Sequence, residues 1–249
     1  MCVTPESVCM AKALLTCIML CISSLAMTQE KGKVIYDENA EARTVGSFHA
    51  IKVSHGIDLF ISQGTDEAVA VSAVQAGHRN RIKTVVEDGV LRIYFDDRVM
   101  GWNWRGRNMR AYVSVKTIRE IAASGGSDVI VRGALNCPDL KLKLSGGSDF
   151  NGEVHVTNLE IDQSGGSDSR VRGKAVNVKV EASGGSDFNG YELDAEYAIV
   201  TVSGGSDADV KVSKELAAEA SGGSDVNYKG NPVIKYKSAS GGSSVTKRG

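Results

Sequence analysis

The chain has 249 residues. It contains 28 glycines, three prolines and 6% aromatic residues, a composition that argues against a conventional globular core. Fourteen of the glycines lie in one repeated motif, two in each of seven copies, so the glycine excess is architectural. With a formal net charge of -1 and no basic patch, the sequence gives no electrostatic reason to expect a nucleic-acid partner.

Residues 1–26 have the pattern of a signal peptide. Lys12 precedes an apolar run that begins at Ala13, and the segment ends in the small-x-small sequence Ser24-Leu25-Ala26. The run is shorter than the roughly 20 apolar residues of a membrane-spanning helix, so we expect no transmembrane segment in the mature chain. We expect export to the periplasm, the outer-membrane surface or the medium. The polar residues 27–33 are expected to form a flexible linker.

Cysteine usage agrees with export but supplies no crosslink. Cys137 is the only cysteine beyond residue 26, so it has no partner for an internal disulfide. Lipid attachment at Cys17 or Cys21 is the alternative to cleavage, although Thr16 and Leu20 stand where a small residue is usually required. The four histidines show no metal-ligand spacing.

Residues 34–117 are expected to form an N-terminal β part with no long amphipathic helix. Apolar and polar residues alternate along several short runs, as they do in half-buried strands. Two of these runs, 82–86 and 90–95, flank Glu87-Asp88-Gly89. An Asp-Gly pair between β-prone segments predicts a tight hairpin.

A loop after this hairpin holds both tryptophans of the chain. Trp102 and Trp104 lie beside Arg105 and Arg107. Indole faces stack on sugar rings or cations, and guanidinium groups bind hydroxyls and carboxylates in one plane. These four residues are our candidate ligand-binding site, for a glycan or a cell-surface protein. The alternative is a lid in which the tryptophans fold back on the strands.

Residues 118–249 carry the motif Ser-Gly-Gly-Ser-Asp at steps of 18 to 21 residues, which indicates stacked repeats. The copies begin at Ser124, Ser145, Ser164, Ser183, Ser203, Ser221 and Ser240, and the last of them ends in Ser244 instead of aspartate. Apolar residues alternate on both sides of each copy, so each repeat predicts strand, bend and strand. Ser54-His55-Gly56-Ile57-Asp58 fits as a degenerate earlier copy. We therefore expect an all-β protein, a parallel β-helix of stacked coils.

Outward positions support the stacking independently. The residues four places before the first serine are Glu120, Lys141, Glu160 and Lys179, and their charges alternate from one coil to the next. Coils stacked in register would pair each carboxylate with lysines on both sides, at about 0.2–1 kcal/mol per pair. The alternation ends at Ile199.

The motif itself has a mechanical interpretation and a metal-binding alternative. Glycine permits the positive φ and the close approach that a bend in stacked coils requires. The aspartates would form a column about 4.8 Å apart, and their repulsion must be offset by backbone amides, serine hydroxyls, basic residues or bound cations. A turn-capping role is our main interpretation, and calcium binding is the alternative, with these candidate ligands: Asp128, Asp149, Asp168, Asp187, Asp207 and Asp225.

With these residues in view, the chain resembles the head-GIN domain family, whose members are described as putative auto-transporter adhesins. The resemblance covers about residues 34–249 and rests on the motif series together with Arg43-Thr44-Val45-Gly46-Ser47-Phe48-His49-Ala50-Ile51 and Val53-Ser54-His55-Gly56. It implies an exported, all-β, right-handed parallel β-helix of the single-stranded type. It brings no catalytic residues to transfer.

We therefore predict a non-enzymatic, exported β-helical protein of the cell envelope that acts in adhesion or binds glycan or protein partners. No cofactor is expected apart from the calcium alternative. Two other functions remain open. A polysaccharide-active enzyme would require an irregular acid/base cluster on one face of the solenoid, because parallel β-helices also host such enzymes. A purely structural envelope protein, with or without calcium, would need no ligand site.

Overall fold

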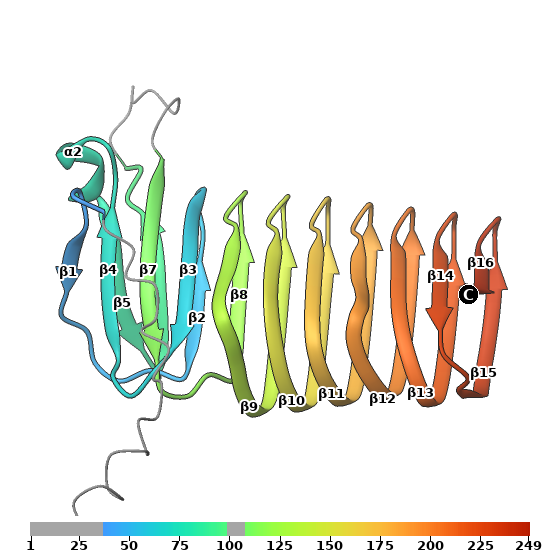
Figure 1. The fold of residues 1–249 in the computed structure, drawn as a ribbon. Helices are drawn as coiled ribbons and strands as arrows, with labels where there is room; N and C mark the ends of the chain where they lie inside the picture. Colours follow the sequence, from blue (N-terminus) through green and yellow to red (C-terminus); the bar gives the residue numbers. More distant parts are fainter. Residues whose placement is uncertain (1–36, 99–107) are drawn as a thin grey trace, which may run out of the picture. The chain divides into compact units, whose positions relative to one another are not determined.

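The computed structural model describes residues 37–98 and 108–249, and residues 38–249 form one compact unit. This unit is a parallel β-solenoid of about seven turns, which confirms the predicted all-β fold (Figure 1). The one helix in the described ranges, α2, has four residues, Ala76–Arg79. No helix in those ranges has the length and apolarity needed to cross a bilayer.

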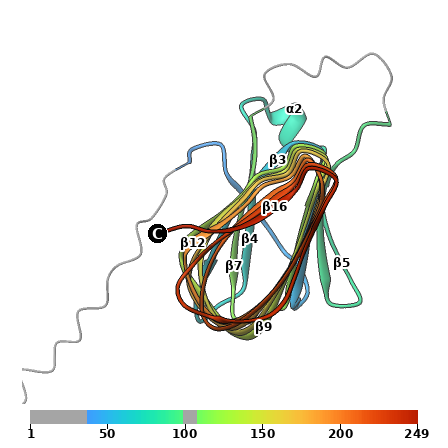
Figure 2. The same ribbon diagram turned by 90° about the vertical axis from the view of Figure 1, so that its right-hand side faces the viewer.

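Each coil consists of a strand that enters a Ser-Gly-Gly turn and a strand that leaves it. We call these two sides of the solenoid the leading side and the following side. Viewed along the stack, the coils superimpose as flattened loops with two long sides (Figure 2). Five long strands run from the following side round the lower bend to the leading side: β9 (Val129–Ser145), β10 (Phe150–Ser164), β11 (Ser169–Gly184), β12 (Phe188–Gly204) and β13 (Asp207–Ser221).

The coils pair in parallel and in register over most of their length. On the leading side, for example, Ile161 lies opposite Val180 of the next coil, and Glu160 lies opposite Lys179. An in-register stack of near-identical repeats places every motif residue above its counterpart. The repeat therefore builds columns, as the sequence predicts.

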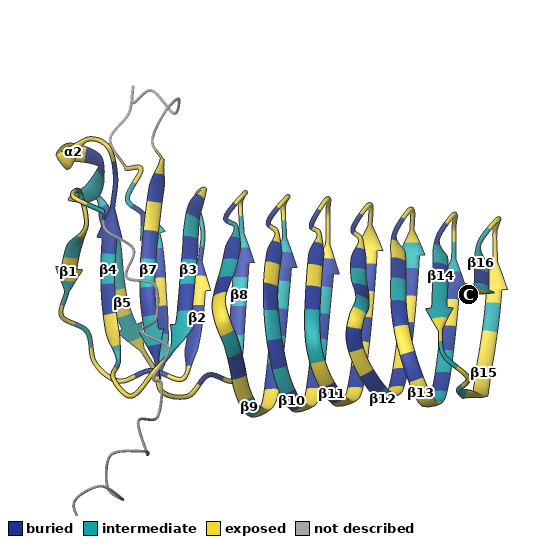
Figure 3. Ribbon diagram, in the orientation of Figure 1, coloured by how far each residue is buried: buried dark blue, intermediate teal, exposed yellow. Residues whose placement is uncertain are grey.

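The core is the space between the two sides. Buried residues alternate with more exposed ones along the long strands β9 to β13, so one face of each of these strands points inward (Figure 3). One inward column of the leading side is apolar and buried in six successive coils: Ile121, Leu142, Ile161, Val180, Val200 and Ala218.

Inward residues on the following side fill a nearly constant volume by two different means. Where a coil carries a large Phe188, it has Gly190 two residues later, and a Cβ at Gly190 would lie 2.6 Å from the Phe188 ring. The next coil instead carries Ala208 and Val210 at the same register positions. A large-plus-glycine pair therefore alternates with a small-plus-valine pair.

The N-terminal strands extend both sides of the stack and cover its first coils. On the following side the order is β1-β4-β7-β3, and on the leading side β5-β6-β2-β8. The β5–β6 hairpin turns at Asp88 and Gly89, both with positive φ, which confirms the Asp-Gly prediction. Their bounds are β1 Glu41–Arg43, β2 Ala50–Val53, β3 Ile57–Gln63, β4 Ala68–Ser72, β5 Ile82–Glu87, β6 Val90–Phe95, β7 Met109–Val115 and β8 Glu120–Ser124.

The degenerate copy predicted at Ser54 is confirmed as a coil of the stack. Val53 lies opposite Ala123 and Leu59 lies opposite Val129, so residues 54–58 lie beside the motif copy at 124–128. The backbone amide of Ile57 donates a 3.0 Å hydrogen bond to Ser127 Oγ.

The C-terminal coil is formed by three short strands, β14 (Asp225–Lys229), β15 (Val233–Ser240) and β16 (Ser244–Lys247). β15 ends the leading side, and its pairing with β13 contains a register shift after Ile234. Beyond the shift, Lys237 lies opposite the buried Ala218. A lysine thus occupies the register position that is apolar in every preceding coil.

Candidate functional site

The second serine of the motif forms a buried hydrogen-bonded column. In successive copies the backbone amide of one coil donates to the serine hydroxyl of the next, with five such bonds of 3.0–3.4 Å. These serines are completely buried: Ser127, Ser148, Ser167, Ser186, Ser206 and Ser224. Several hydroxyls also donate to the carbonyl three residues earlier, as Ser186 does to Ser183. Each buried hydroxyl is therefore satisfied within the scaffold.

The aspartates form a second column whose bonds run in the opposite direction. Here the backbone amide of each coil donates to the aspartate carboxylate of the preceding coil, at 2.9–3.3 Å in six successive steps. Asp187 Oδ1, for example, accepts from the Asp207 amide at 3.3 Å. Backbone amides are thus one of the offsets that we expected for the stacked carboxylates, and they support the turn-capping interpretation.

Burial nevertheless raises the pKa of several carboxyls in this column. The pKa values of Asp58, Asp128 and Asp187 lie above the ordinary 3.8, chiefly because burial disfavours the charged form. Neighbouring aspartates raise them further, and hydrogen bonds from backbone amides act in the opposite direction.

Arg110 lowers the pKa of Asp58, but three basic residues that lie four places after the motif aspartates have other partners. Arg172 donates to Asn151 at 2.9 Å, and Lys211 pairs with Asp194 at 2.7 Å. Lys229 lies 4.1 Å from the centre of the Tyr191 ring. Within the described ranges, no group of three or more His, Cys, Asp or Glu side chains is arranged to hold a metal ion. Calcium at the aspartate column stays a prediction.

The predicted ligand-binding residues Trp102, Trp104, Arg105 and Arg107 lie outside the described residues. The signal peptide and the linker predicted at 1–33 lie outside them as well.

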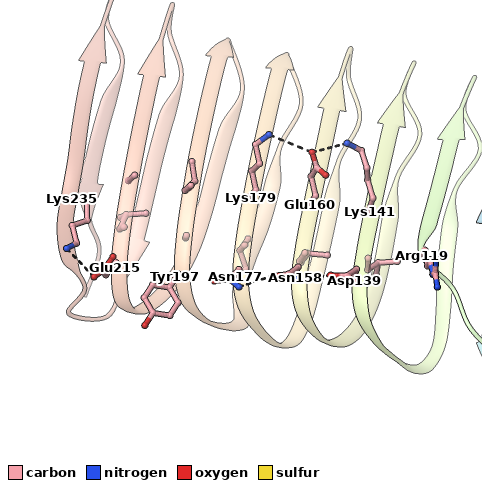
Figure 4. A pocket seen from close by; sticks show the side chains of 17 residues that line it. Arg119, Asp139, Lys141, Asn158, Glu160, Asn177, Lys179, Tyr197, Glu215 and Lys235 are labelled. Atoms are coloured by element: carbon pink, nitrogen blue, oxygen red, sulfur yellow. Dashed lines mark hydrogen bonds and ion pairs between the residues drawn. The ribbon is translucent and has the colours of Figure 1, made fainter.

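A groove of about 770 Å³ crosses the outer surface of the leading side near the lower bends (Figure 4). We call it the leading groove. It runs along the stack from β9 to β13 and reaches β15 through Lys235. Because each coil contributes the same register positions, its lining consists of rows of side chains parallel to the stack.

One row of the leading groove begins with an aspartate and two amides and continues through an aromatic ring to a glutamate. The Asn158 amide donates to Asp139 at 2.6 Å, and the Asn177 amide donates to Asn158 at 2.8 Å. Tyr197 follows in the same row, and Figure 4 shows its side chain on the outer surface beside Asn177. Glu215 comes next, and Lys235 pairs with it at 3.2 Å.

A second row contains the alternating charges predicted from the sequence. Glu160 lies between two lysines, at 2.8 Å from Lys141 and 3.7 Å from Lys179. The Lys141 hydrogen bond is the main cause of the lowered Glu160 pKa, and the same ion pairs raise the pKa of Lys141 above its usual range. The in-register stack therefore neutralises this row internally, as we expected.

The charged row becomes apolar where the alternation ends. In the charged row, Lys179 is followed by Ile199, Ala217 and Tyr236. Ile199 is 56% exposed and Tyr236 is 53% exposed. Of eight large hydrophobic residues that are exposed in the described ranges, five belong to this region: Tyr197, Ile199, Val233, Ile234 and Tyr236. We call these five residues and Ala217 the apolar patch. Clustering of this kind is typical of interaction surfaces.

Sequence reasoning missed the apolar patch as a site. The signal was present, since the loss of charge alternation at Ile199 marks the coil where the patch begins. It could be interpreted only once the register showed which residues stand beside Ile199.

A larger but shallower hollow lies on the other side of the lower bends. Its volume is about 1180 Å³, and its lining includes Cys137, His155 and Lys211. Burial raises the pKa of the Cys137 thiol, so this cysteine is not an activated nucleophile. Only one exposed large hydrophobic residue, Val176, contributes to the lining. The leading groove is the stronger candidate.

The sequence can now be placed among known proteins. A family model described as "Putative auto-transporter adhesin, head GIN domain" matches residues 47–232. The chain belongs to this family. The family assignment predicted from the sequence is therefore confirmed.

Solved structures of similar fold come from Bacteroides and Parabacteroides. A putative adhesin from Bacteroides fragilis NCTC 9343 has a TM-score of 0.77 at 19% identity, over 84% of this chain and 96% of that one. A putative lipid binding protein from Parabacteroides distasonis ATCC 8503 has a TM-score of 0.66 at 17% identity, over 86% and 98%. A putative adhesin from Parabacteroides merdae ATCC 43184 has a TM-score of 0.64 at 18% identity, over 84% and 95%. No curated protein matches the sequence.

Proposed function

We propose that this head-GIN domain protein is an exported, non-enzymatic adhesin that binds a cell-surface partner through the leading groove and its apolar patch. The observation that carries the proposal is the patch itself. Five of the eight exposed large hydrophobic residues in the described ranges gather in this one region of the scaffold. Burying them against a partner would gain about 25 cal/mol for each Å² of apolar surface removed from water.

The chemistry of the groove supports binding rather than catalysis. A glycosidase needs one carboxyl with a raised pKa as the acid, beside a second carboxylate. In the leading groove Glu160 has a lowered pKa because it accepts a hydrogen bond from Lys141. Asp139 and Glu215 are bonded to Asn158 and Lys235. These are the pairings of a rigid surface, and they favour the adhesin over the polysaccharide-active enzyme.

Export and the Trp/Arg loop belong to the same proposal. The segment 1–26 acts as a signal peptide and places the mature chain in the periplasm or on the cell surface. Residues Trp102, Trp104, Arg105 and Arg107 provide a second contact to the partner. Mass spectrometry of the N-terminus after expression of the full chain tests the first point, and cleavage after Ala26 is the expected result.

The binding surface is tested on an array that carries both glycans and purified cell-surface proteins. The exported chain should bind at least one component, and replacing Ile199 and Tyr236 by serine should abolish that binding. The double substitution of Trp102 and Trp104 by alanine should weaken it. Loss of binding in the tryptophan variant alone would move the site from the leading groove to the loop. Turnover of an acidic polysaccharide by the unaltered chain would replace the adhesin with the enzyme.

A further inference from the structure

We propose that the leading groove binds an uncharged, extended glycan chain, with Tyr197 as a stacking platform and the hollow at Ala217 as the seat of one sugar ring. This inference rests on the proposed function and names the ligand class of the same surface.

The charges that line the groove favour a neutral ligand. Four basic and three acidic side chains line it, and three lysines pair with carboxylates of the solenoid. Lys179, for example, lies 2.7 Å from Glu181 as well as 3.7 Å from Glu160. An anionic polymer or an anionic membrane would require basic side chains that are free to face it. The three lysines already have carboxylate partners, and the exposed Arg119 lies at the end of the groove, before β9 (Figure 4). Along β9 to β13, charge therefore does not select the ligand.

The direction of the groove favours an extended chain. Its lining comes from five successive long strands, β9 to β13, at equivalent positions. Neighbouring strands are about 4.8 Å apart, a repeat close to the length of one sugar ring in an extended glycan. A chain lying along the stack would therefore meet the same kind of side chain at each successive sugar.

The amide row supplies groups that match sugar hydroxyls. A hydroxyl both donates and accepts, and so does a carboxamide. Asn158 uses one N–H and its oxygen within the row, so its second N–H is left for a ligand. Asn177 Oδ1 accepts no hydrogen bond from the described part of the chain, and it lies at the end of the row that meets Tyr197.

The apolar patch supplies the complementary face. A sugar ring has an apolar C–H surface and a polar rim, and tyrosine offers an apolar ring with a polar tip. Lys214 Nζ lies 5.3 Å from the centre of the Tyr197 ring and pairs with Glu196 at 2.7 Å, which holds the ring in place. Ala217 is a small side chain between Ile199 and Tyr236 in one row. The row therefore has a gap beside the Tyr197 platform.

A protein strand is a poorer occupant of the same region. A protein strand that extended the sheet would pair with the edge of β15. That edge carries Lys235, Lys237 and a register shift, and features of this kind oppose edge pairing. A ligand lying on the surface of the leading side needs no free edge.

The experiment measures binding of the exported chain to a printed set of neutral and acidic oligosaccharides, followed by calorimetry with the best neutral series from two to seven sugars. We expect affinity to rise with length up to about five sugars, one for each strand at the strand spacing. We expect it to change less than twofold between low and high salt, because a neutral ligand displaces no counterions. Vesicles of zwitterionic and of anionic lipid serve as the comparison probes and should not bind.

Variants locate the site. Tyr197→Ala should weaken binding about tenfold, whereas Tyr197→Phe should stay within about threefold, since the ring supplies the stacking. Ala217→Leu should fill the hollow and weaken binding by a similar factor. Val176→Ala, outside the groove, is the matched control for a lost exposed apolar group and should leave affinity unchanged. Thermal unfolding must be alike in all four variants.

The outcomes separate this inference from the proposed function. Binding of a cell-surface protein that depends on Ile199, with no neutral glycan bound, would overturn the glycan assignment and keep the adhesin. Preference for acidic glycans, strong salt dependence or vesicle binding would also overturn the assignment. If no glycan and no protein bound, both the glycan inference and the proposed adhesin function would be wrong.

Discussion

At the scale of single residues, one five-residue motif performs three tasks in every coil. The first glycine has a positive φ, and a Cβ at Gly184 would lie 2.9 Å from the carbonyl oxygen of Gly165 in the preceding coil. The second serine receives a backbone amide from the coil before it, and the aspartate receives one from the coil after it. The motif is therefore a pair of hydrogen-bonded columns around a close glycine contact.

The aspartate column can be tested by separating its charge from its acceptor. Asp187→Asn keeps the oxygen that accepts from the Asp207 amide and removes the repulsion between neighbouring carboxylates. We expect its urea midpoint to match or exceed that of the unaltered chain. Asp187→Ala removes the acceptor and should cost about 0.5–1.5 kcal/mol.

A cation in the column would remove the difference between these two variants. Asn would then destabilise as much as Ala, and a chelator would lower the melting temperature of the unaltered chain. Equal melting curves with added calcium and with chelator would leave turn capping as the only role of these aspartates.

Raised carboxyl pKa values predict a pH dependence of stability. The folded chain binds protons at Asp58, Asp128 and Asp187 more tightly than the unfolded chain does, because their pKa values lie above 3.8. Their contribution to the unfolding free energy is complete below 3.8 and is lost as the pH rises through the folded values. We expect stability to increase as the pH falls from 7 toward those values.

The lowered pKa of Glu160 works in the other direction, since its contribution is lost as the pH falls below its ordinary 4.5. Urea unfolding at a series of pH values should therefore show a maximum on the acidic side of neutrality. Replacing both Asp128 and Asp187 by asparagine should flatten the slope above that maximum. An unchanged slope would contradict the assignment to this column.

At the scale of elements, much of the fold could be predicted because every coil repeats the same strand, bend and strand pattern in its own sequence. The period, the bend, the charge alternation and the Asp-Gly hairpin are local signals. Exceptions inside the core could not be predicted in this way. Gln163 and Ser169 interrupt the apolar alternation, yet both are buried. Ser169 donates to Gln163 at 2.7 Å, and Gln163 donates to the Ser167 carbonyl at 2.8 Å. The two meet across a single Ser-Gly-Gly turn, and only the folded coil shows that they are partners.

The candidate site was hidden for a related reason. Tyr197 and Tyr236 are 39 positions apart in the sequence and occupy neighbouring outward rows only after stacking. A periodic pattern reveals what repeats, whereas a binding surface consists of what fails to repeat. The Trp/Arg loop attracted attention because its residues are consecutive.

Core packing within a coil gives a prediction at this scale. Gly190→Val should destabilise by about 1–3 kcal/mol, because its side chain would overlap the Phe188 ring. Phe188→Ala should cost about 3–5 kcal/mol through the cavity it leaves. The double substitution reproduces the Ala208 and Val210 arrangement of the next coil, so its cost should be less than the sum of the single costs. Simple additivity in urea unfolding would show that the two positions do not share one volume.

At the scale of the whole described unit, a solenoid needs ends that do not pair with the strands of another chain. Antiparallel strands cover the N-terminal coils, and charge interrupts the other end. The exposed Lys237 lies in register with buried apolar residues of the preceding coils, and a charged side chain on an edge strand opposes pairing with a second chain.

Lys237→Val should therefore promote association. It would continue the apolar column to the end of the leading side and leave an edge that suits another strand. Light scattering coupled to size-exclusion chromatography, over a range of protein concentrations, should show larger species than those of the unaltered chain. Lys237→Arg keeps the charge and should behave like the unaltered chain. Identical elution of the valine variant at all concentrations would mean that other features of this edge suffice.

The two hydrogen-bonded columns run in opposite directions, so the first and the last copies of the motif depart from it at different positions. A serine at the fourth position accepts a backbone amide from the coil before it, and the degenerate copy at 54–58 has Ile57 there, whose own amide donates to Ser127. An aspartate at the fifth position serves the coil after it, and the last copy has Ser244 there. In the degenerate copy His55, with a φ of 68°, takes the place of the first glycine. Among these copies, the column of serine acceptors therefore begins at Ser127, and the column of aspartate acceptors ends at Asp225. A longer version could be made by inserting complete copies between Asp58 and Ser240, because each inserted copy would continue both columns of hydrogen bonds.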